Sequence, residues 1–493
     1  MNRQIRGLGA GLIVLFAALF IQLNVVQVVR ADHYDTDAGN NRSVVRDFTR
    51  PRGSILTADG VVIAESVPSA DRYRYQRVYP TNELFAHTSG YFSFTLGSTQ
   101  LENSQNDTLS GQTAQLQLEG LKDLFSDQVN TGDVVTTLRA DLQQVAKDAL
   151  GEREGSVVLL DPRSGAVKAL WSYPSYDPNL IASHDFDEAT AVKTFYDAAP
   201  GKPLLANSYQ ERYLPGSTFK VVTATAALES GQYTLASEFP PVETYLPPQT
   251  TDPIENYGGT TCGGNFVEVF RRSCNTAFAE MAVTVGAPAM VAKSEAFGFN
   301  AAPPFDLPRP AESVFGTVED FEDNIPLLAI GGFGQGNTQA TPLEMALVAS
   351  AVANGGEIMT PHVVDRTVSR DGQTLTRTQP KAWRRAMEPA TAATMTGLMI
   401  EVVNNGTARC CMSLAGGIQA AAKTGTAQLN PKGEPPASHA WIIGFAPAEA
   451  PRYAIAVMVK ATPEVTAGTG GTVAGPIAQQ VLNAALALPE TPS

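Results

Sequence analysis

The sequence feature that most constrains this chain is the segment from Tyr213 to Lys220, Tyr-Leu-Pro-Gly-Ser-Thr-Phe-Lys, followed by an apolar, alanine-rich run. The Pro-Gly pair indicates a turn, and the residues after it favour a helix that begins at or near Ser217. Lys220 would lie one turn further on, on the same face, where its amine could take the proton of the serine hydroxyl. The pattern therefore predicts a nucleophile beside its base, although so short a motif more often marks a capping serine and a solvated lysine.

Two later motifs favour the catalytic interpretation. Ser273-Cys-Asn275 is a Ser-x-Asn pattern, and Lys423-Thr-Gly425 lies in an apolar stretch that reads as a strand. Alone, the first could be a helix cap and the second an edge-strand lysine before a turn glycine. In the order Ser-x-x-Lys, Ser-x-Asn, Lys-Thr-Gly, the three form the signature of penicillin-binding proteins and serine β-lactamases.

With these motifs the chain resembles the class B penicillin-binding proteins, and among them most closely the actinobacterial members. The resemblance covers nearly the whole length and extends to further segments, namely Arg52-Gly-Ser-Ile55, Pro174–Asn179, Gly334-Gln-Gly336 with Thr341-Pro342, and His439–Phe445. It implies an α+β chain with a transmembrane anchor at residues 1–31, a small β-rich pedestal or dimerisation-like domain at 32–140, and a serine β-lactamase-like transpeptidase domain at 141–493. In that last domain, helices would flank an antiparallel sheet.

The resemblance also implies roles for the motif residues. Ser217 would be the nucleophile, Lys220 its base, Ser273 a proton relay to the leaving amine, and Asn275 a partner of the lysine amine or of the substrate amide. Recognition of a substrate carboxylate would fall to the second lysine and its neighbours, namely Lys423, Thr424, Gly425 and Thr426. The backbone N–H groups of Ser217 and Thr426 would form the oxyanion hole.

Composition narrows the possible partners. The net charge is −14 over 493 residues, and no basic stripe is available to neutralise the phosphates of a nucleic acid. The five histidines are scattered and no Cys-x-x-Cys spacing occurs, so neither a metal site nor any other cofactor is expected.

The first thirty residues predict a membrane anchor. Arg3 and Arg6 precede an apolar stretch that starts at Leu8 and continues to Val29, about the 20 residues that span a bilayer. Basic residues before it and three aspartates after it, Asp32, Asp35 and Asp37, predict a cytoplasmic N-terminus and an extracytoplasmic bulk. A cleaved signal peptide is the competing interpretation.

Four cysteines outside the membrane raise the question of disulfides. Cys262 and Cys274 flank a short segment that leads into the Ser-x-Asn motif, so a bridge there could brace it, unless an intervening helix holds the sulfurs apart. Cys410 and Cys411 are adjacent, and a ring between neighbours would be strained.

Several elements follow from local patterns. An Asp-Gly turn between apolar runs predicts a hairpin at residues 53–67, and a Pro/Gly turn predicts another at 155–171. Helices are expected at 141–150, 343–352 and 475–488, and a strand at 452–459. Residues 32–49 are predicted to form an extended linker, and residues 177–207 a loop-rich segment. The second Ser-x-Asn pattern, at residues 104–106, is interpreted as a chance occurrence.

The function implied by the resemblance is cross-linking of peptidoglycan stem peptides that end in D-Ala-D-Ala, with β-lactams as covalent inhibitors. The implied partner is a polytopic glycosyltransferase of the shape, elongation and division type, contacted through the anchor and the Arg52 region. Three alternatives are a β-lactamase, a D,D-carboxypeptidase of the same fold, and a non-catalytic membrane scaffold or β-lactam sensor. Against a sensor, only about six residues precede the apolar stretch, which leaves no room for cytoplasmic signalling machinery.

Overall fold

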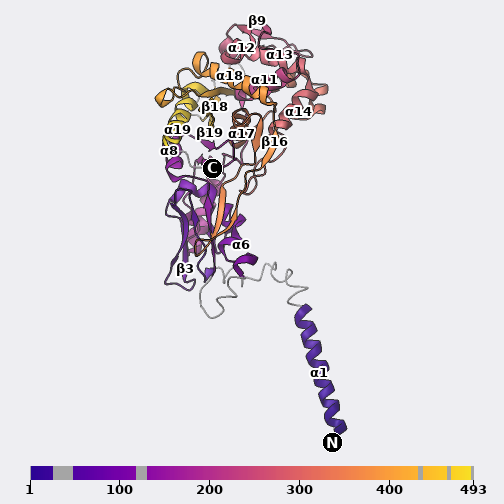
Figure 1. The fold of residues 1–493 in the computed structure, drawn as a ribbon, viewed down its shortest axis with the longest axis vertical. Helices are drawn as coiled ribbons and strands as arrows, with labels where there is room; N and C mark the ends of the chain where they lie inside the picture. Colours follow the sequence, from indigo (N-terminus) through magenta and orange to yellow (C-terminus); the bar gives the residue numbers. More distant parts are fainter. Residues whose placement is uncertain (1, 26–47, 118–129, 431–436, 463–467, 490–493) are drawn as a thin grey trace.

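The computed structural model describes residues 2–25, 48–117, 130–430, 437–462 and 468–489. Two sheets lie one above the other along the long axis of the main body, and the N-terminal helix stands apart from them (Figure 1). The expected linker, residues 32–49, falls almost entirely outside the described residues.

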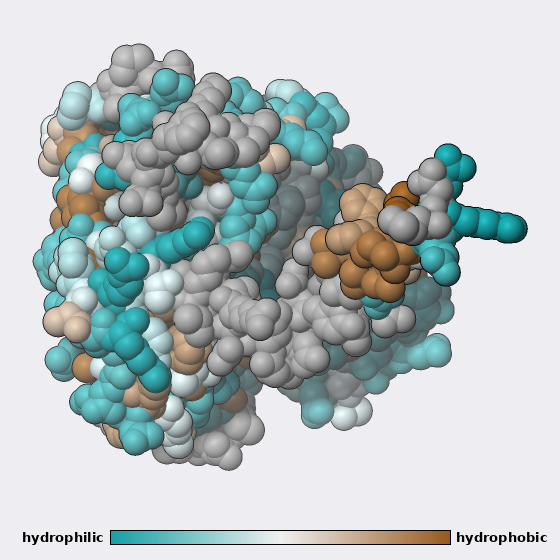
Figure 2. Space-filling view, turned by 90° about the horizontal axis from the view of Figure 1, so that it is seen from below, coloured by the Kyte–Doolittle hydropathy of each residue, from teal (hydrophilic) through white to brown (hydrophobic). Residues whose placement is uncertain are grey.

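Helix α1, Asn2–Asn24, is long and apolar enough to cross a membrane over Arg3–Asn24, and none of that window is buried against the protein. Its apolar side chains form the brown column that projects from the main body in Figure 2. An apolar helix with no protein surface to cover its side chains needs another apolar environment, so the predicted single anchor agrees with the described part of the chain.

The lower sheet has six strands in the order β15-β14-β6-β1-β2-β3. The strands are β1 Ile55–Leu56, β2 Val62–Pro68, β3 Tyr75–Val78, β6 Gly132–Thr136, β14 Val364–Ser369 and β15 Thr374–Arg377. The β1–β2 pair confirms the hairpin expected at residues 53–67. The antiparallel β14–β6 pairing was not anticipated, because β14 and β15 come from far beyond the boundary expected at residue 141. The sheet therefore joins chain segments that the sequence analysis had placed in separate domains.

A buried ionic group holds this lower region together. The Glu102 carboxylate accepts from Nε of Arg52 and from Nε of Arg77, both at 2.6 Å, and all three side chains are almost completely buried. Burial alone would raise the pKa of Glu102, but the two guanidinium groups outweigh it and hold that pKa below its ordinary value. Asn106, from the second Ser-x-Asn pattern, accepts from Arg52 in this group at 2.9 Å and lies outside the candidate active site.

The upper sheet has five antiparallel strands in the order β17-β18-β19-β7-β8. Their bounds are β7 Gly155–Leu160, β8 Val167–Tyr173, β17 Ala421–Gln428, β18 Ser438–Ala446 and β19 Tyr453–Val459. This confirms the hairpin expected at 155–171 and the strand expected at 452–459. β17, which carries the Lys-Thr-Gly motif, is an edge strand, so one side of it is free to face a substrate.

Helices cover this sheet on both faces, as expected. Helix α17, Pro342–Ala353, packs against β7, β18 and β19, and the pair α8, Ala140–Leu150, and α19, Gly475–Ala487, packs against β8 and β19 (Figure 1). These three helices confirm the predictions at 343–352, 141–150 and 475–488.

The remaining elements surround these layers. The helices are η2 Asn82–Phe85, α4 Ala86–Ser89, α5 Gln100–Ser104, α6 Asn106–Leu109, α9 Pro178–Ile181, α10 Phe186–Ala198, η3 Gly216–Phe219, α11 Lys220–Glu229, η4 Tyr257–Gly259, α12 Phe266–Arg272, α13 Asn275–Val285, α14 Ala287–Phe297, α15 Val318–Glu322, α16 Ile325–Gly331, α18 Pro389–Asn405, η5 Ala415–Gly417 and η6 Gly470–Ala474. The short strands are β4 Phe92–Ser93, β5 Gly97–Ser98, β9 Glu238–Val242, β10 Thr244–Tyr245, β11 Ile254–Glu255, β12 Cys262–Asn265, β13 Glu357–Met359 and β16 Ala382–Arg385.

Helix α10 corrects the expectation of a loop-rich segment at residues 177–207. Asp185 caps its N-terminus by accepting from the backbone N–H of Glu188, and two acidic residues follow in the first turn. A short polar helix that buries only Ala189 gives little hydrophobic periodicity, which explains why the pattern missed it.

One buried carboxyl in α17 makes the stability of this domain depend on pH. Glu344 is fully buried, and within the described residues its two carboxyl oxygens have no hydrogen-bond partner. Burial raises the pKa of Glu344 to about 8, despite the nearby charge of Arg384. The native state therefore keeps a proton that the unfolded chain releases near its ordinary pKa of 4.5.

We predict that Glu344→Gln removes this dependence. In the unaltered protein, the contribution of Glu344 is fully present below the unfolded pKa and is lost as pH rises through about 8, by up to about 1.4 kcal/mol per pH unit. Thermal unfolding from about pH 5 to pH 9 should show a shallower fall for the glutamine variant, which should be the more stable protein at the alkaline end. Glu449→Gln, at an exposed position, should behave like the unaltered protein. Parallel pH curves for all three proteins would contradict the assignment.

Candidate active site

The turn that carries Ser217 is held from two sides. The indole Nε1 of Trp441 donates to the carbonyl of Leu214 at 3.0 Å, and the backbone N–H of Gly216 donates to the carbonyl of Gly334 at 2.9 Å. Gly334 has φ 76°, and a Cβ there would lie 2.2 Å from the Gly216 oxygen, so only glycine fits. Ser217 lies in η3, directly before α11, which confirms its predicted place at a helix N-terminus.

The two motif lysines lie behind Ser217, and both are fully buried. The Lys220 amine donates to the Ser273 carbonyl at 2.7 Å and to Asn275 Oδ1 at 2.8 Å, and lies 3.3 Å from Ser273 Oγ. The Lys423 amine lies 2.9 Å from the same hydroxyl oxygen. The Ser273 hydroxyl therefore stands between two amines.

Among the described residues, no hydrogen bond joins Lys220 to Ser217, although a direct contact between them was expected. Residues 273–275 supply all the partners of the Lys220 amine instead. Hydrogen bonds between a nucleophile and its base are often long without substrate and tighten in the complex. The sequence correctly placed the two residues at neighbouring positions, but it did not reveal that another motif holds the amine.

The surroundings of the two lysines favour their neutral forms. Burial lowers the pKa of Lys220 well below its ordinary value, and the nearby charge of Lys423 lowers it further. Burial also lowers the pKa of Lys423, to about 7. Burial therefore favours the neutral form of Lys220, and with a pKa of about 7, Lys423 is only partly charged near neutral pH.

The Ser-x-Asn motif lies in the turn between α12 and α13. Ser273 has φ 62°, which ends α12, and Asn275 begins α13. The Asn275 amide nitrogen donates to the Glu255 carbonyl at 3.1 Å, which turns Oδ1 of Asn275 toward Lys220. Asn256 Oδ1 accepts from the backbone N–H groups of Asn275 and Thr276 and so caps α13. No sequence pattern marks Glu255 or Asn256, because their roles arise only from tertiary contact.

The structure joins Cys262 to Cys274, with a Cα–Cα distance of 5.6 Å. Helix α12 does lie between them, but the chain turns back on both sides of it, so the obstacle considered from the sequence does not apply. Cys410 and Cys411 also form a disulfide, although the strain expected in a ring between neighbouring cysteines had argued against one.

The Lys-Thr-Gly strand lies directly against the nucleophile turn. A Cβ at Gly425 would lie 2.8 Å from the Pro215 carbonyl, and one at Gly216 would lie 3.0 Å from the Ala427 nitrogen. Thr424 shares a hydroxyl–hydroxyl hydrogen bond with Thr407, and the Thr426 hydroxyl accepts from the Gly470 N–H at 3.4 Å. Glycine at both contacts lets β17 and η3 approach closely.

These segments surround a cavity of about 230 Å³. Five predicted residues line it, namely Ser217, Ser273, Asn275, Thr424 and Thr426. Eight lining residues were not predicted, namely Tyr257, Arg272, Phe333, Gln335, Thr407, Gln428, Thr469 and Gly471. Of these, Gln335 is the middle residue of the Gly-Gln-Gly motif, Phe333 precedes that motif and Arg272 precedes Ser273, so their positions in or beside the motifs were the available signal.

Comparison with known families agrees with this geometry. The family model of the penicillin-binding protein transpeptidase domain matches residues 155–483, and that of the penicillin-binding protein A dimerisation domain matches residues 52–135. The chain belongs to the penicillin-binding protein transpeptidase family.

Relatives of this transpeptidase match along nearly the whole chain. A protein of Mycolicibacterium smegmatis named peptidoglycan D,D-transpeptidase PbpA is 38% identical over 99% of both chains, and one of the same name from Mycobacterium tuberculosis is 36% identical over the same shares. Among solved structures, penicillin-binding protein A from M. tuberculosis as a ceftriaxone acyl-enzyme complex superposes with a TM-score of 0.83 at 35% identity, covering 90% of this chain and all of that one.

We predict that the α13 cap tunes the site through Asn275. Asn256→Ala removes the cap and loosens the backbone at the start of α13, from which Asn275 reaches Lys220, so acylation by a β-lactam should slow by about tenfold, with a stability loss of about 1 kcal/mol. Thr317→Ala removes a comparable cap from α15, away from the lysines, and should lower stability without slowing acylation. Stopped-flow acylation and thermal unfolding of both variants separate the effects. An Asn256→Ala protein that reacts at the unaltered rate would refute the positioning role.

Proposed function

We propose that this transpeptidase cross-links peptidoglycan stem peptides ending in D-Ala-D-Ala through an acyl-enzyme on Ser217. The observation that carries the proposal is the buried Lys220 amine, whose pKa is lowered by burial and by Lys423 and which lies three residues after Ser217 at the start of the same helical segment. An unprotonated amine can accept the Ser217 proton as the oxygen attacks the carbonyl between the two alanines.

The proton then has a path to the leaving group. Ser273 Oγ lies 3.3 Å from the Lys220 amine and 2.9 Å from the Lys423 amine. A hydroxyl accepts and donates at once, so Ser273 can pass the proton to the amine of the departing D-alanine as the C–N bond breaks. An amine from a second stem peptide attacks the resulting ester, Ser217 recovers its proton, and a new amide bond forms.

The remaining motif residues bind or stabilise negative charge on the substrate. In this proposal, Lys423 binds the substrate's terminal carboxylate, assisted by the hydroxyls of Thr424 and Thr426. The backbone N–H groups of Ser217 and Thr426 stabilise the oxyanion. The edge position of β17 and its close approach to η3 support this assignment, because they bring those two backbone segments together.

The protein is a covalent target of β-lactams in the same mechanism, since the acyl-enzyme structures of its relative are of that kind. The alternatives of a β-lactamase, a carboxypeptidase and a scaffold or sensor have no specific observation in their favour, and the named relatives are transpeptidases.

We further propose that α1 anchors the chain with its N-terminus in the cytoplasm and the catalytic domain outside the membrane. Two basic residues before the apolar stretch support this orientation, and so do the two disulfides, which form in oxidising compartments. A polytopic glycosyltransferase remains the proposed partner. The Arg52 side chain is only 5% exposed and bound to Glu102, so contact in that region would use the surface around it and not the arginine itself.

We expect Ser217→Ala to abolish covalent labelling by a fluorescent penicillin, by at least about a thousandfold, because the proposed acyl-enzyme forms on the Ser217 oxygen. The matched control is Ser104→Ala, in the second Ser-x-Asn pattern, which should label normally. Gel fluorescence after timed incubation measures both. Labelling retained in Ser217→Ala would show that Ser217 is not the nucleophile. Rapid hydrolysis of penicillin by the unaltered protein would favour a β-lactamase.

The two lysines should give acylation a bell-shaped pH profile. Acylation needs Lys220 neutral, so the rate should fall at acid pH. It also needs Lys423 charged, so with a carboxylated β-lactam the rate should fall again as pH rises through about 7 in the free enzyme. Lys423→Arg keeps a permanent cation and should lose the alkaline fall while keeping the acid one, at a rate lowered by about tenfold.

The second-order acylation rate from pH 5 to about pH 10 measures this profile. Lys460→Arg, at a lysine that directly follows β19 and pairs with Glu154, is the matched control and should leave both limbs in place. An alkaline limb unchanged in Lys423→Arg, or an acid limb unchanged in Lys220→Ala, would show that the groups are wrongly assigned.

A further inference from the structure

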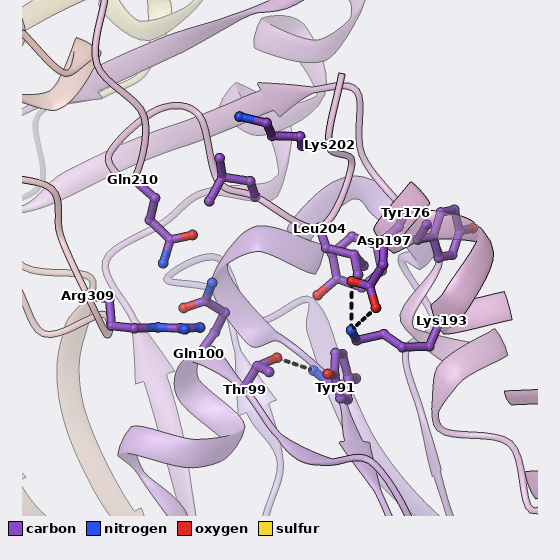
Figure 3. A pocket seen from close by; sticks show the side chains of 12 residues that line it. Tyr91, Thr99, Gln100, Tyr176, Lys193, Asp197, Lys202, Leu204, Gln210 and Arg309 are labelled. Atoms are coloured by element: carbon purple, nitrogen blue, oxygen red, sulfur yellow. Dashed lines mark hydrogen bonds and ion pairs between the residues drawn. The ribbon is translucent and has the colours of Figure 1, made fainter. Parts of the chain in front are cut away.

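A second and larger cavity, of about 500 Å³, lies away from Ser217, where the segment matched by the dimerisation-domain model meets the transpeptidase (Figure 3). Tyr91 and Gln100 line it from the first unit. Lys193 of α10, Lys202 and Arg309 line it from the second. A ligand held here would touch both units at once.

The cavity is cationic in an acidic protein. Its lining contains three basic side chains and a single acidic one, Asp197, whereas the whole chain carries a net charge of −14. Lys193 is bound to Asp197 at 2.6 Å and Lys202 lies 3.4 Å from Glu211. Among the described residues, the Arg309 guanidinium makes no hydrogen bond or ion pair, and Figure 3 shows it extending across the cavity toward Gln100. Arg309 is an exposed residue at this cavity, and a guanidinium without a protein partner there is suited to a carboxylate.

The backbone presents these groups in an unusual way. Gln100, Lys202 and Arg309 have φ values of 48°, 51° and 55°, in the left-handed region that non-glycine residues rarely adopt. They are three of the eight such residues in the described chain, and Ser273 of the active site is another. Conformations of this kind cost free energy and gather at functional sites.

Aromatic side chains form the inner wall. Tyr91, Tyr176 and Tyr196 follow one another edge to face, with ring centroids 6.5 and 5.9 Å apart. Gln100 is 6% exposed, and in the part of the chain that is described its Nε2 atom makes no hydrogen bond. Tyrosine rings, a side-chain amide with a free donor and a cation together are the groups that bind the ring faces, acetamido carbonyls and carboxylates of an acidic sugar.

The cavity is connected to the nucleophile by a short path. Gln100 Oε1 accepts from the Tyr209 hydroxyl at 2.8 Å, and the Tyr209 carbonyl accepts from the Ala311 N–H, two residues from Arg309. Tyr209 itself lies eight residues before Ser217 in the same segment. The residues that would contact a ligand are therefore the ones that support the start of the nucleophile loop.

We propose that this cavity is a second, non-catalytic binding site for a carboxylate-bearing glycopeptide, a sugar joined to a short acidic peptide. The proposal rests on the proposed function, because a strand of the polymer being cross-linked has this chemistry. Arg309 binds the carboxylate, the Gln100 amide donates to an acetamido carbonyl, and the tyrosine rings pack against the sugar. Such a site would hold a strand at the junction of the two units while another part of it occupies the catalytic cavity.

The test is calorimetric titration of muramyl dipeptide into the full-length chain in detergent, first acylated to completion with penicillin so that Ser217 is blocked. We expect saturable binding with one site per chain. Arg309→Gln should weaken it by at least about tenfold, and Arg309→Lys should retain part of the affinity. The matched control Arg370→Gln removes an exposed arginine from the β14–β15 turn and should bind normally. Chitotriose, a neutral sugar, and a free acidic dipeptide should each bind at least tenfold more weakly.

The outcomes separate the two proposals. Failure of the unaltered protein to acylate would count against the proposed function, and the same titration on unacylated protein would still test the cavity. Equal binding by the Arg309→Gln and unaltered proteins, no binding by either, or equal binding of chitotriose would overturn the second site. Normal penicillin labelling of Arg309→Gln shows that the variant is folded.

Discussion

The catalytic arrangement depends on two fully buried lysine amines that approach the same serine hydroxyl. Burying a cation is costly, and burying two near each other is more so, because neither finds a carboxylate among its described partners. Burial correspondingly lowers the pKa of Lys220 well below its ordinary value and that of Lys423 to about 7, so both charged forms are disfavoured. In the proposed mechanism, the base is therefore produced mainly by burial, and the nearby charge of Lys423 reinforces it.

That packing needs close approach between backbone segments that are far apart in sequence. Gly334 receives the Gly216 N–H, and Gly425 lies against the Pro215 carbonyl, in spaces where a Cβ would clash. Trp441, opposite Gly425 on β18, then fixes the turn through Leu214. Catalytic distances are thus set by glycine contacts and one indole hydrogen bond, which act directly on the position of Ser217.

The sequence predicted the motifs, their elements and the sheet that carries them, because short patterns with strong local character determine those features. It could not predict contacts made by residues without such a pattern. Asn256 caps α13 from 19 residues away, and α10 buries too little to show a helical period. The direct Ser217–Lys220 bond was the natural inference from i, i+3 spacing, but residues from another helix took the amine instead.

The junction between the two units also depends on tertiary contacts that no local sequence pattern reveals. Strand β14 pairs with β6 over five register positions, so the lower sheet contains strands on both sides of the catalytic domain's first strands in sequence. A boundary placed just before the helix predicted at residues 141–150 cannot show this, since pairing across more than two hundred residues leaves no local signal. Because the sheet is shared, the lower unit cannot swing freely about a single linker. A cavity between the units is therefore enclosed by walls whose relative position the shared sheet limits, and groups from both can form one site.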